Sequence, residues 1–362
     1  MMIRISAILL FFWSLGITQA QRTISTLSVP RSLASGIAAK NGMEIFIGGG
    51  ATYSANKVHS VIDIYNVTSD RWYVDSLSQA RFAMASASVK GLILFAGGVT
   101  DLNLGEVSDR VDIYNIVHEH KIAALSQSRG ALAGTSNDDK ALFAGGITNF
   151  IKGETSETVD IFDAATSTWK IAKLSLPRGY LTATTCGDFA FFAGGIINYA
   201  GDSAVVTNRI DVYNYKTNSW TIDSVSVARG GMVAASIEDN VLFAGGHDSK
   251  YNALNIVDIY DISTRTWSVD TLSQARGELT ATAVGNTIYF AGGYTNYTNS
   301  VMSNRIDVYH VLTGTWTTDS LSCARSELTS AAAGNILFIA GGGSYSSNRE
   351  FDTVDILKQE NK

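Results

Sequence analysis

Two neighbouring units of a repeated sequence each place a glutamate two residues after an arginine, at Glu278 and Glu327. Paired carboxylates can transfer protons, coordinate a hard cation or accept hydrogen bonds from a polyol. Single solvated acids on a surface give the same pattern. Both interpretations stay open at this stage, because the choice depends on how the fold places the two side chains.

Other units carry an aromatic residue one or two positions after the arginine, at Phe82 and Tyr180. More aromatic residues, many beside an asparagine, occur in segments that differ between the units in length and sequence. Aromatic faces and amide groups on loops suit sugars or peptides, although asparagine is also an ordinary turn residue. We therefore group all of them with the two glutamates as ligand-binding candidates. Those in the variable segments are Tyr53, Phe150, Tyr199, Tyr251, Tyr297 and Tyr345.

An arginine and an aspartate recur once in each of seven units. A ring of guanidinium groups would bind an anion. A structural ion pair explains a sevenfold pattern better, because sites are usually asymmetric and scaffolds are not. The arginine can reach over a diglycine that has no side chains, across strands about 4.8 Å apart. The predicted pairs are Arg31 with Asp63, Arg81 with Asp112, Arg129 with Asp160, Arg178 with Asp211, Arg229 with Asp258, Arg276 with Asp307, and Arg325 with Asp355.

The spacing of these motifs predicts the elements that position them. Seven diglycines, the first of them Gly48-Gly49, end short apolar runs at intervals of 47 to 51 residues, and a spaced tyrosine and tryptophan follow in most units. Each unit is typical of four short strands: a small-residue strand a, an apolar strand b, a strand c with the aspartate, and a strand d near the tryptophan. Small residues suit a crowded centre and large ones a wide rim. We predict an all-β, seven-bladed β-propeller of four-stranded antiparallel blades.

Two units depart from the pattern. The seventh ends after Asp355 without a strand d, and residues 22–28 align with strand d of the first unit. We therefore expect the N-terminal strand to close the ring in the last blade, which also covers a sheet edge. In the second unit Lys121 stands at the tryptophan position, so we expect looser packing there.

A four-stranded unit with a period near 50, a double glycine and a spaced Tyr/Trp pair resembles the kelch-repeat family. The resemblance extends over nearly the whole chain after residue 20. It implies a binding module whose ligand meets the loops between strands b and c and the starts of the a strands. The channel-mouth residues of this surface are expected to bury little on folding. Exported kelch propellers also include sialic acid mutarotases, which act through charged residues in the funnel.

The N-terminus has the features of a signal peptide. A short basic start precedes the apolar stretch from Ile5 to Ile17, and small residues end it at Ala20. We expect residues 1–20 to be removed and residues 21–362 to form one secreted domain without membrane insertion. The net charge of −6, with no basic stripe, argues against nucleic acid as a partner.

Scarce cysteines and two sequons complete the sequence signals. Cys186 and Cys323 fall at opposite ends of different units, so we expect two free thiols.

Asn66 and Asn296 each begin a glycosylation sequon and are candidate glycan sites, which predicts a glycoprotein if the source is eukaryotic.

The leading hypothesis is a secreted monomer that binds a glycan, peptide or protein, without a cofactor, a metal or catalytic residues. The alternatives are an exported small-molecule enzyme of the mutarotase type and a structural surface protein with no discrete site. Fold alone does not decide among them.

Overall fold

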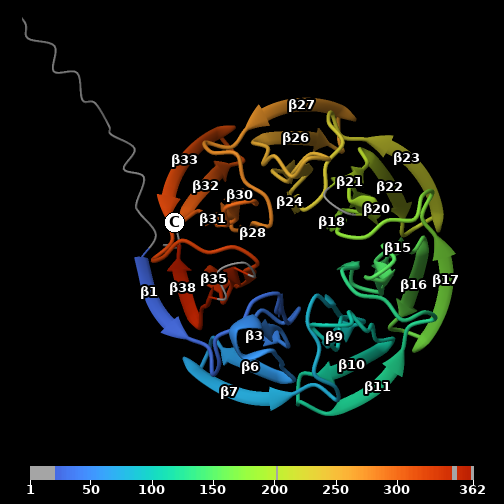
Figure 1. The fold of residues 1–362 in the computed structure, drawn as a ribbon, viewed down its shortest axis with the longest axis vertical. Helices are drawn as coiled ribbons and strands as arrows, with labels where there is room; N and C mark the ends of the chain where they lie inside the picture. The colour runs from blue at the N-terminus through green and yellow to red at the C-terminus, as the bar shows by residue number, and fades with distance from the viewer. Residues whose placement is uncertain (1–20, 201–202, 345–348, 360–362) are drawn as a thin grey trace, which may run out of the picture.

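The computed structural model describes residues 21–200, 203–344 and 349–359. Within these residues the strands form seven four-stranded antiparallel sheets arranged as a ring, which confirms the predicted seven-bladed propeller (Figure 1). Residues 1–20, the predicted signal peptide, lie outside the described residues. None of the described residues forms a helix with the length and hydropathy that a membrane-spanning segment needs.

In the first six blades the strands follow the chain from the channel to the rim. Their bounds, blade by blade, are β2 (Ser35–Ala38), β3 (Glu44–Gly48), β6 (Val61–Asn66) and β7 (Arg71–Ser76); β8 (Ala85–Val89), β9 (Leu92–Ala96), β10 (Arg110–Asn115) and β11 (His120–Ala124); β12 (Ala133–Ser136), β13 (Lys140–Ala144), β16 (Thr158–Asp163) and β17 (Thr168–Lys173); β18 (Thr182–Cys186), β19 (Phe189–Ala193), β22 (Arg209–Asn214) and β23 (Ser219–Ser224); β24 (Val233–Ile237), β25 (Asn240–Ala244), β26 (Ile256–Asp261) and β27 (Thr266–Thr271); and β28 (Thr280–Val284), β29 (Thr287–Ala291), β32 (Arg305–His310) and β33 (Thr315–Ser320).

The seventh blade takes its outer strand from the N-terminus. It consists of β34 (Thr329–Ala333), β35 (Ile336–Ala340), β38 (Thr353–Lys358) and β1 (Gln21–Thr26). Figure 1 shows β1 against β38 at the rim, and their register runs from Gln21 opposite Lys358 to Thr26 opposite Thr353. The ring is therefore closed as the alignment of residues 22–28 predicts.

Short hairpins occupy the loops between strands b and c, all at the end of the ring where each a strand begins. This end is called the b–c face below. In five blades the hairpins, with one 3-10 turn, are β4 (Ala51–Thr52), η1 (Tyr53–Ala55) and β5 (Lys57–Val58); β14 (Ile147–Asn149) and β15 (Glu154–Thr155); β20 (Ile196–Ala200) and β21 (Ser203–Val206); β30 (Tyr294–Asn296) and β31 (Val301–Met302); and β36 (Gly343–Ser344) and β37 (Arg349–Glu350).

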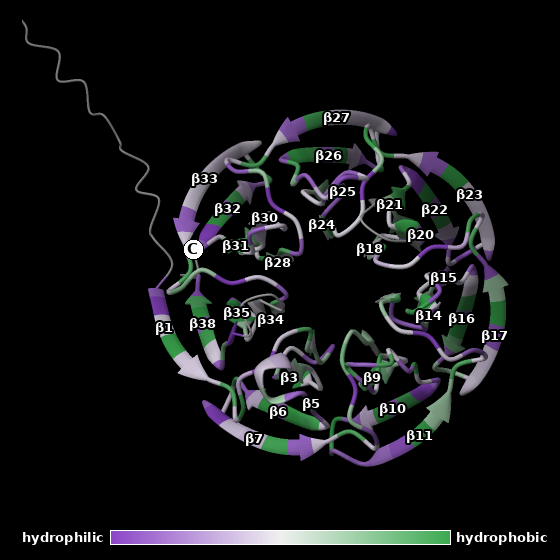
Figure 2. Ribbon diagram, in the orientation of Figure 1, coloured by the Kyte–Doolittle hydropathy of each residue, from purple (hydrophilic) through white to green (hydrophobic). Residues whose placement is uncertain are grey.

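The core lies between neighbouring blades, where apolar strand-b residues meet the tyrosine and tryptophan of the rim. Tyr65 and Trp72 pack with Phe338 of the seventh blade, with ring centroids 4.7 to 6.0 Å apart. Figure 2 shows the hydrophobic colouring on third strands such as β26 and β38. The large aromatic residues thus fill the wide outer gaps that the taper of a propeller creates.

The diglycines join successive blades through their backbone. The second glycine of each pair donates its N–H to the carbonyl of the next blade's arginine, and Gly342 completes the circle by donating to Arg31 at 2.9 Å. Both glycines have positive φ, a conformation that favours glycine. In the first blade this pair is Gly49-Gly50, so the prediction of Gly48-Gly49 was one residue early because three glycines stand in a row there.

The second blade differs from the prediction at its rim. The residue opposite Tyr114 is His120 and not Lys121, because the turn between β10 and β11 is one residue shorter than in other blades. The His120 ring stacks on Tyr114 at 4.5 Å with an interplanar angle of 4°. His120 is nevertheless exposed, whereas the tryptophans of the other blades are partly buried, which agrees with the looser packing expected at this rim. The assignment of Lys121 to the tryptophan position was wrong.

Both cysteines are free thiols, as their positions in the repeats predict. Cys186 is buried at the far end of β18, where its Sγ contacts the Glu238 carbonyl at 2.9 Å. Burial raises the pKa of this thiol to about 11. Cys323 lies beside Arg325 on the b–c face.

Candidate functional site

The seven arginines are structural. Each is fully buried and pairs with the aspartate on strand c of its own blade, at 2.6 to 2.8 Å in five blades. The pairs Arg81 with Asp112 and Arg276 with Asp307 have the same arrangement. In several blades the guanidinium also donates to a strand-b carbonyl, as Arg178 does to Phe192. These arginines are enclosed by protein and are not presented to an anionic ligand.

The aspartate of each pair also anchors the linker from the preceding blade. Its second carboxylate oxygen accepts the backbone N–H of a linker serine, as Asp160 does from Ser126 at 2.9 Å. The same contact recurs in the other blades, from Ser28, Ser78, Ser175, Ser226, Ser273 and Ser322. The ion pair therefore fixes where the chain enters strand a.

The second residue after each arginine belongs to a closed ring of backbone hydrogen bonds around the channel. Each donates its N–H to the carbonyl of its counterpart in the preceding blade, at 2.9 to 3.4 Å. All seven have positive φ. We call this the mouth ring; its members are Leu33, Ala83, Ala131, Tyr180, Gly231, Glu278 and Glu327.

The mouth ring presents side chains to the channel. A cavity of about 180 Å³ is lined by six of its members, Glu327 being the exception, and by the residues that follow them. Among the described residues that line the cavity, Glu278 is the only acidic or basic one. The mouth is thus a rigid, mostly apolar rim that carries a carboxyl group and the ring of Tyr180.

The first residue after each arginine does not line this cavity, because the positive φ of the residue that follows turns the backbone between the two. It pairs with the residue after the diglycine, as Phe82 does with Val99. Phe82 is only 9% exposed and packs with Ala51 and Val99, and Phe150 is partly buried against this group. The prediction that Phe82 lies at the channel mouth was therefore wrong.

The other described candidates gather on the b–c face of blades 1, 4, 5, 6 and 7. The rings of Tyr251 and Tyr297 lie 6.1 Å apart, centroid to centroid. Glu327 accepts a long hydrogen bond of 3.4 Å from the hydroxyl of Tyr294. Tyr53 and Tyr180 interact electrostatically with each other, and Tyr53 also with Glu327. For the remaining two candidates, Tyr199 lies in β20 with its backbone paired to Ala204, and Tyr345 lies outside the described residues.

Two further residues of the site, His247 and Tyr294, were not among the candidates predicted from the sequence. His247 contacts both Tyr251 and Tyr297, with centroids 4.9 and 5.1 Å apart. Both follow a diglycine directly, where blades 1 to 4 carry Ala51, Val99, Ile147 and Ile196. The change from an aliphatic to a polar ring at one repeat position was the signal that distinguishes them.

The electrostatics of the mouth differ from those of a solvated surface. Burial raises the pKa of Glu278 to about 7. Burial and the nearby Glu278 charge raise the pKa of Glu327 to about 8. Burial also raises the pKa of Tyr297 and lowers that of His247. The two glutamates are thus partly buried and not fully solvated surface acids, and their raised pKa values mean that near neutral pH the pair holds protons that free carboxyls would have lost.

These shifts predict how stability depends on pH. An unfolded chain releases the two protons near pH 4.5, whereas the folded protein keeps them to about pH 7 to 8. The folded state binds more protons in this range, so the free energy of unfolding falls as pH rises through it. In the double variant Glu278→Gln/Glu327→Gln, we expect the free energy of unfolding to fall less as pH rises. The difference from wild type should be about 2 kcal/mol or more, since each pKa unit is worth about 1.4 kcal/mol.

Urea unfolding of wild type and of the double variant between about pH 5 and about pH 8.5 checks this expectation. The difference between the two curves gives the contribution of the two glutamates to the pH dependence. The contributions of His247, Glu350 and the nearby tyrosines are present in both proteins and cancel. His247 acts in the opposite direction, because its lowered pKa costs stability as pH falls. Parallel curves for the two proteins would show that the carboxyls ionise as free acids.

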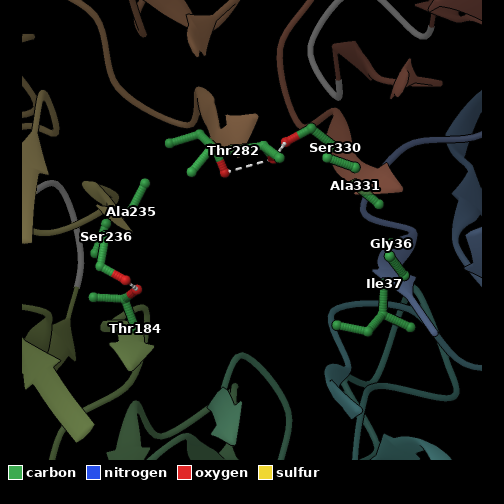
Figure 3. A pocket seen from close by; sticks show the side chains of 13 residues that line it. Gly36, Ile37, Thr184, Ala235, Ser236, Thr282, Ser330 and Ala331 are labelled. Carbon is green, nitrogen blue, oxygen red and sulfur yellow. Dashed lines mark hydrogen bonds between the residues drawn. The ribbon is translucent and has the colours of Figure 1, made fainter. Parts of the chain in front are cut away.

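Farther along the a strands the channel widens into a cavity of about 300 Å³ (Figure 3). Its lining consists mainly of small residues, with hydroxyl groups that bond across neighbouring blades. Thr184 donates to Ser236 at 3.1 Å, and Thr282 bonds to Ser330. Because these hydroxyls satisfy one another, the mouth is the stronger candidate for a ligand site.

Comparison with known proteins agrees with this architecture. A family model described as the KLHDC2/KLHL20/DRC7 Kelch-repeats domain matches residues 180–362, just over half of the chain. A search of curated proteins gave no match. The match begins at Tyr180 of the mouth ring and extends through the blades that carry Glu278 and Glu327. The chain therefore belongs to the kelch-repeat family, whose propellers typically serve as protein-interaction modules.

Proposed function

We propose that the chain is a secreted interaction module that binds a protein or glycan ligand at the mouth ring and the b–c loops. One observation supports this proposal most directly: Tyr180, Glu278 and Glu327 project from a closed backbone ring beside the aromatic loop residues. The ring holds them on a rigid scaffold, which lowers the entropic cost of binding.

The asymmetry of the face favours a discrete site over a purely structural role. The arginines and aspartates repeat in all seven blades, whereas the mouth ring changes from Ala83 and Ala131 to Tyr180, Gly231 and Glu278. A scaffold that only fills space has no need of buried carboxyls at its mouth, because their desolvation costs stability.

A sialic acid mutarotase is the weaker alternative. Sialic acid carries a carboxylate, and the one acidic or basic residue among the described ones that line the mouth cavity is Glu278. The arginines that would attract an anion are enclosed in ion pairs with the strand-c aspartates. An ionised Glu278 repels that carboxylate, and a protonated Glu278 offers it no counter-charge.

Secretion rests on the sequence alone, through the predicted signal peptide at residues 1–20. Of the two sequons, that of Asn296 has the accessible position that a glycan needs. Asn296 is exposed at the end of β30. Asn66 ends β6, where its side chain accepts the N–H groups of Thr68 and Ser69 and donates to Glu44.

Substitution of Tyr180 by alanine tests the site. Alanine already stands at the same ring position in Ala83 and Ala131, so the backbone accepts it. We expect Tyr180→Ala to weaken binding about tenfold or more while the melting temperature changes by only about 2 °C. The probes are a glycan array and a displayed random-peptide library, with affinities of the recovered ligands measured on both proteins.

Tyr73→Ala is the matched control. Tyr73 is 45% exposed on the rim strand β7, far from the mouth, so its removal should leave affinity unchanged. Ligands that bind wild type and Tyr180→Ala equally would place the site elsewhere. If neither probe yields a ligand, the interaction-module proposal loses its support.

A further inference from the structure

The mouth gathers acidic side chains without a basic partner in the described part of the chain. Neither Glu278 nor Glu327 forms an ion pair with any described residue. Glu350 on β37 adds a third acid close enough to raise the pKa of Glu327. Two carboxyls held together under partial burial repel each other, and a cation between them would remove that repulsion.

Three buried side-chain atoms at this place have no hydrogen bond of normal geometry among the described residues: the hydroxyls of Ser32 and Tyr297 and the Oε2 atom of Glu327. The Ser32 hydroxyl lies near enough to Glu327 to act on its pKa, so the Tyr297 hydroxyl is the atom farthest from a partner. Buried polar groups are nearly always satisfied in native proteins, and an orphan at a cavity indicates a missing partner. The Tyr297 hydroxyl and Glu327 Oε2 can both accept a hydrogen bond. The missing partner is therefore best supplied by a donor group.

Glycines create the space that these side chains occupy. A Cβ on Gly277 would lie 2.0 Å from the hydroxyl of Tyr297. A Cβ on Gly231 would lie 2.5 Å from Oε1 of Glu278 and 3.1 Å from the ring of His247. The absence of side chains at Gly231 and Gly277 lets the glutamate, the tyrosine and the histidine come together.

The aromatic rings suit an organic cation better than a bare metal ion. Tyr297 has its ring centroid 5.3 Å from that of Tyr294 and 5.1 Å from that of His247. Tyrosine faces attract ammonium and guanidinium groups. Among the described residues no group of three or more His, Cys, Asp or Glu side chains has the arrangement of a metal site. The adjoining cavity of about 180 Å³ has room for the end of a side chain.

We propose that the mouth binds a lysine or arginine side chain of a protein ligand between Glu278, Glu327 and Tyr297. The proposal rests on the interaction-module function and specifies the chemistry of the ligand. The ammonium or guanidinium group donates to Glu327 Oε2 and to the Tyr297 hydroxyl, and its charge neutralises the paired carboxyls. Binding then releases the protons that the carboxyls hold near neutral pH, so affinity rises with pH.

Selection from the random-peptide library tests this inference with two immobilised proteins, wild type and Glu278→Gln/Glu327→Gln. We expect wild type to enrich peptides with one invariant lysine or arginine. Replacing that residue by glutamine in the peptide, or using the double variant, should weaken binding about tenfold or more. Affinity for the basic peptide should also increase between about pH 6 and about pH 8 for wild type only.

The matched control is Asp138→Asn/Asp139→Asn, which removes the same two charges from exposed acids at the opposite end of the ring. It should bind as wild type does. Enriched peptides that need Tyr180 but contain no basic residue would overturn the inference and leave the interaction module intact. If no peptide is enriched, carbon-13 NMR tests the inference directly. The chemical shifts of the Glu278 and Glu327 carboxyl carbons are then followed as n-butylammonium, or n-butanol as a neutral control, is added. Equal responses to both probes would overturn the inference, and a response to the ammonium alone would show that the mouth takes free amines.

Discussion

Removal of residues 21–29 is expected to cause a large loss of stability. The deleted segment contains the whole of β1, which pairs with β38 along six residues. It also contains Leu27, which is 3% exposed within the core shared by the seventh and first blades. Without it β38 becomes an open edge and two blades lose their junction.

Side-chain contacts of the same segment tie together three blades. Arg22 pairs with Asp319 of the sixth blade at 2.7 Å. Ser25 accepts a hydrogen bond from the indole N–H of Trp72 at 3.0 Å. Ser28 donates its backbone N–H and its hydroxyl to the Asp63 carboxylate of the first blade. We expect a loss of about 5 kcal/mol or more in the free energy of unfolding, which is the whole stability of many domains.

Thermal and urea unfolding of residues 30–362 against residues 21–362 measures the effect. Ile24→Ala is the matched control, since Ile24 is on β1 but 62% exposed and should cost under about 0.5 kcal/mol. A peptide of residues 21–29 added in trans should restore part of the lost stability. An unchanged melting temperature after the deletion would contradict ring closure by β1.

The architecture was predictable because every blade repeats the same sequence motifs. Seven repeats of arginine, diglycine and aspartate specify one strand order, and the ion pairs of Arg129 and Arg178 follow from strand spacing alone. The closing strand was predictable for the same reason, since residues 22–28 repeat the strand d of the first unit. Local counting failed by one residue at two places, the three-glycine run of the first blade and the turn before His120.

The directions of the mouth side chains were not predictable. Phe82 and Ala83 are adjacent, yet the first is buried under the loops and the second lines the channel. The switch depends on positive φ at Ala83 and on the backbone ring, and neither has a sequence signal in a non-glycine residue. The elevated pKa values of Glu278 and Glu327 likewise depend on burial by residues that are distant in sequence.

The second large effect is expected for Arg129→Ala. Arg129 is fully buried, and its Nη2 atom lies 2.8 Å from Oδ2 of Asp160 and 3.3 Å from the Phe143 carbonyl. Its removal leaves Asp160 buried with the Ser126 N–H as its remaining described partner. Breaking one side of a buried ion pair typically costs about 3 to 5 kcal/mol, because an uncompensated charge stays inside the protein.

The variant Arg129→Ala/Asp160→Asn separates the stranded charge from the lost packing. The asparagine can still accept the Ser126 N–H while carrying no charge, so we expect the double variant to unfold at higher urea than Arg129→Ala. Arg265→Ala, at an exposed turn residue, should change stability by under about 0.5 kcal/mol. Ligand affinity per folded molecule should stay at the wild-type value in Arg129→Ala, because Arg129 is enclosed behind the mouth ring. A cost below about 1 kcal/mol together with weakened binding would instead assign Arg129 to the ligand site.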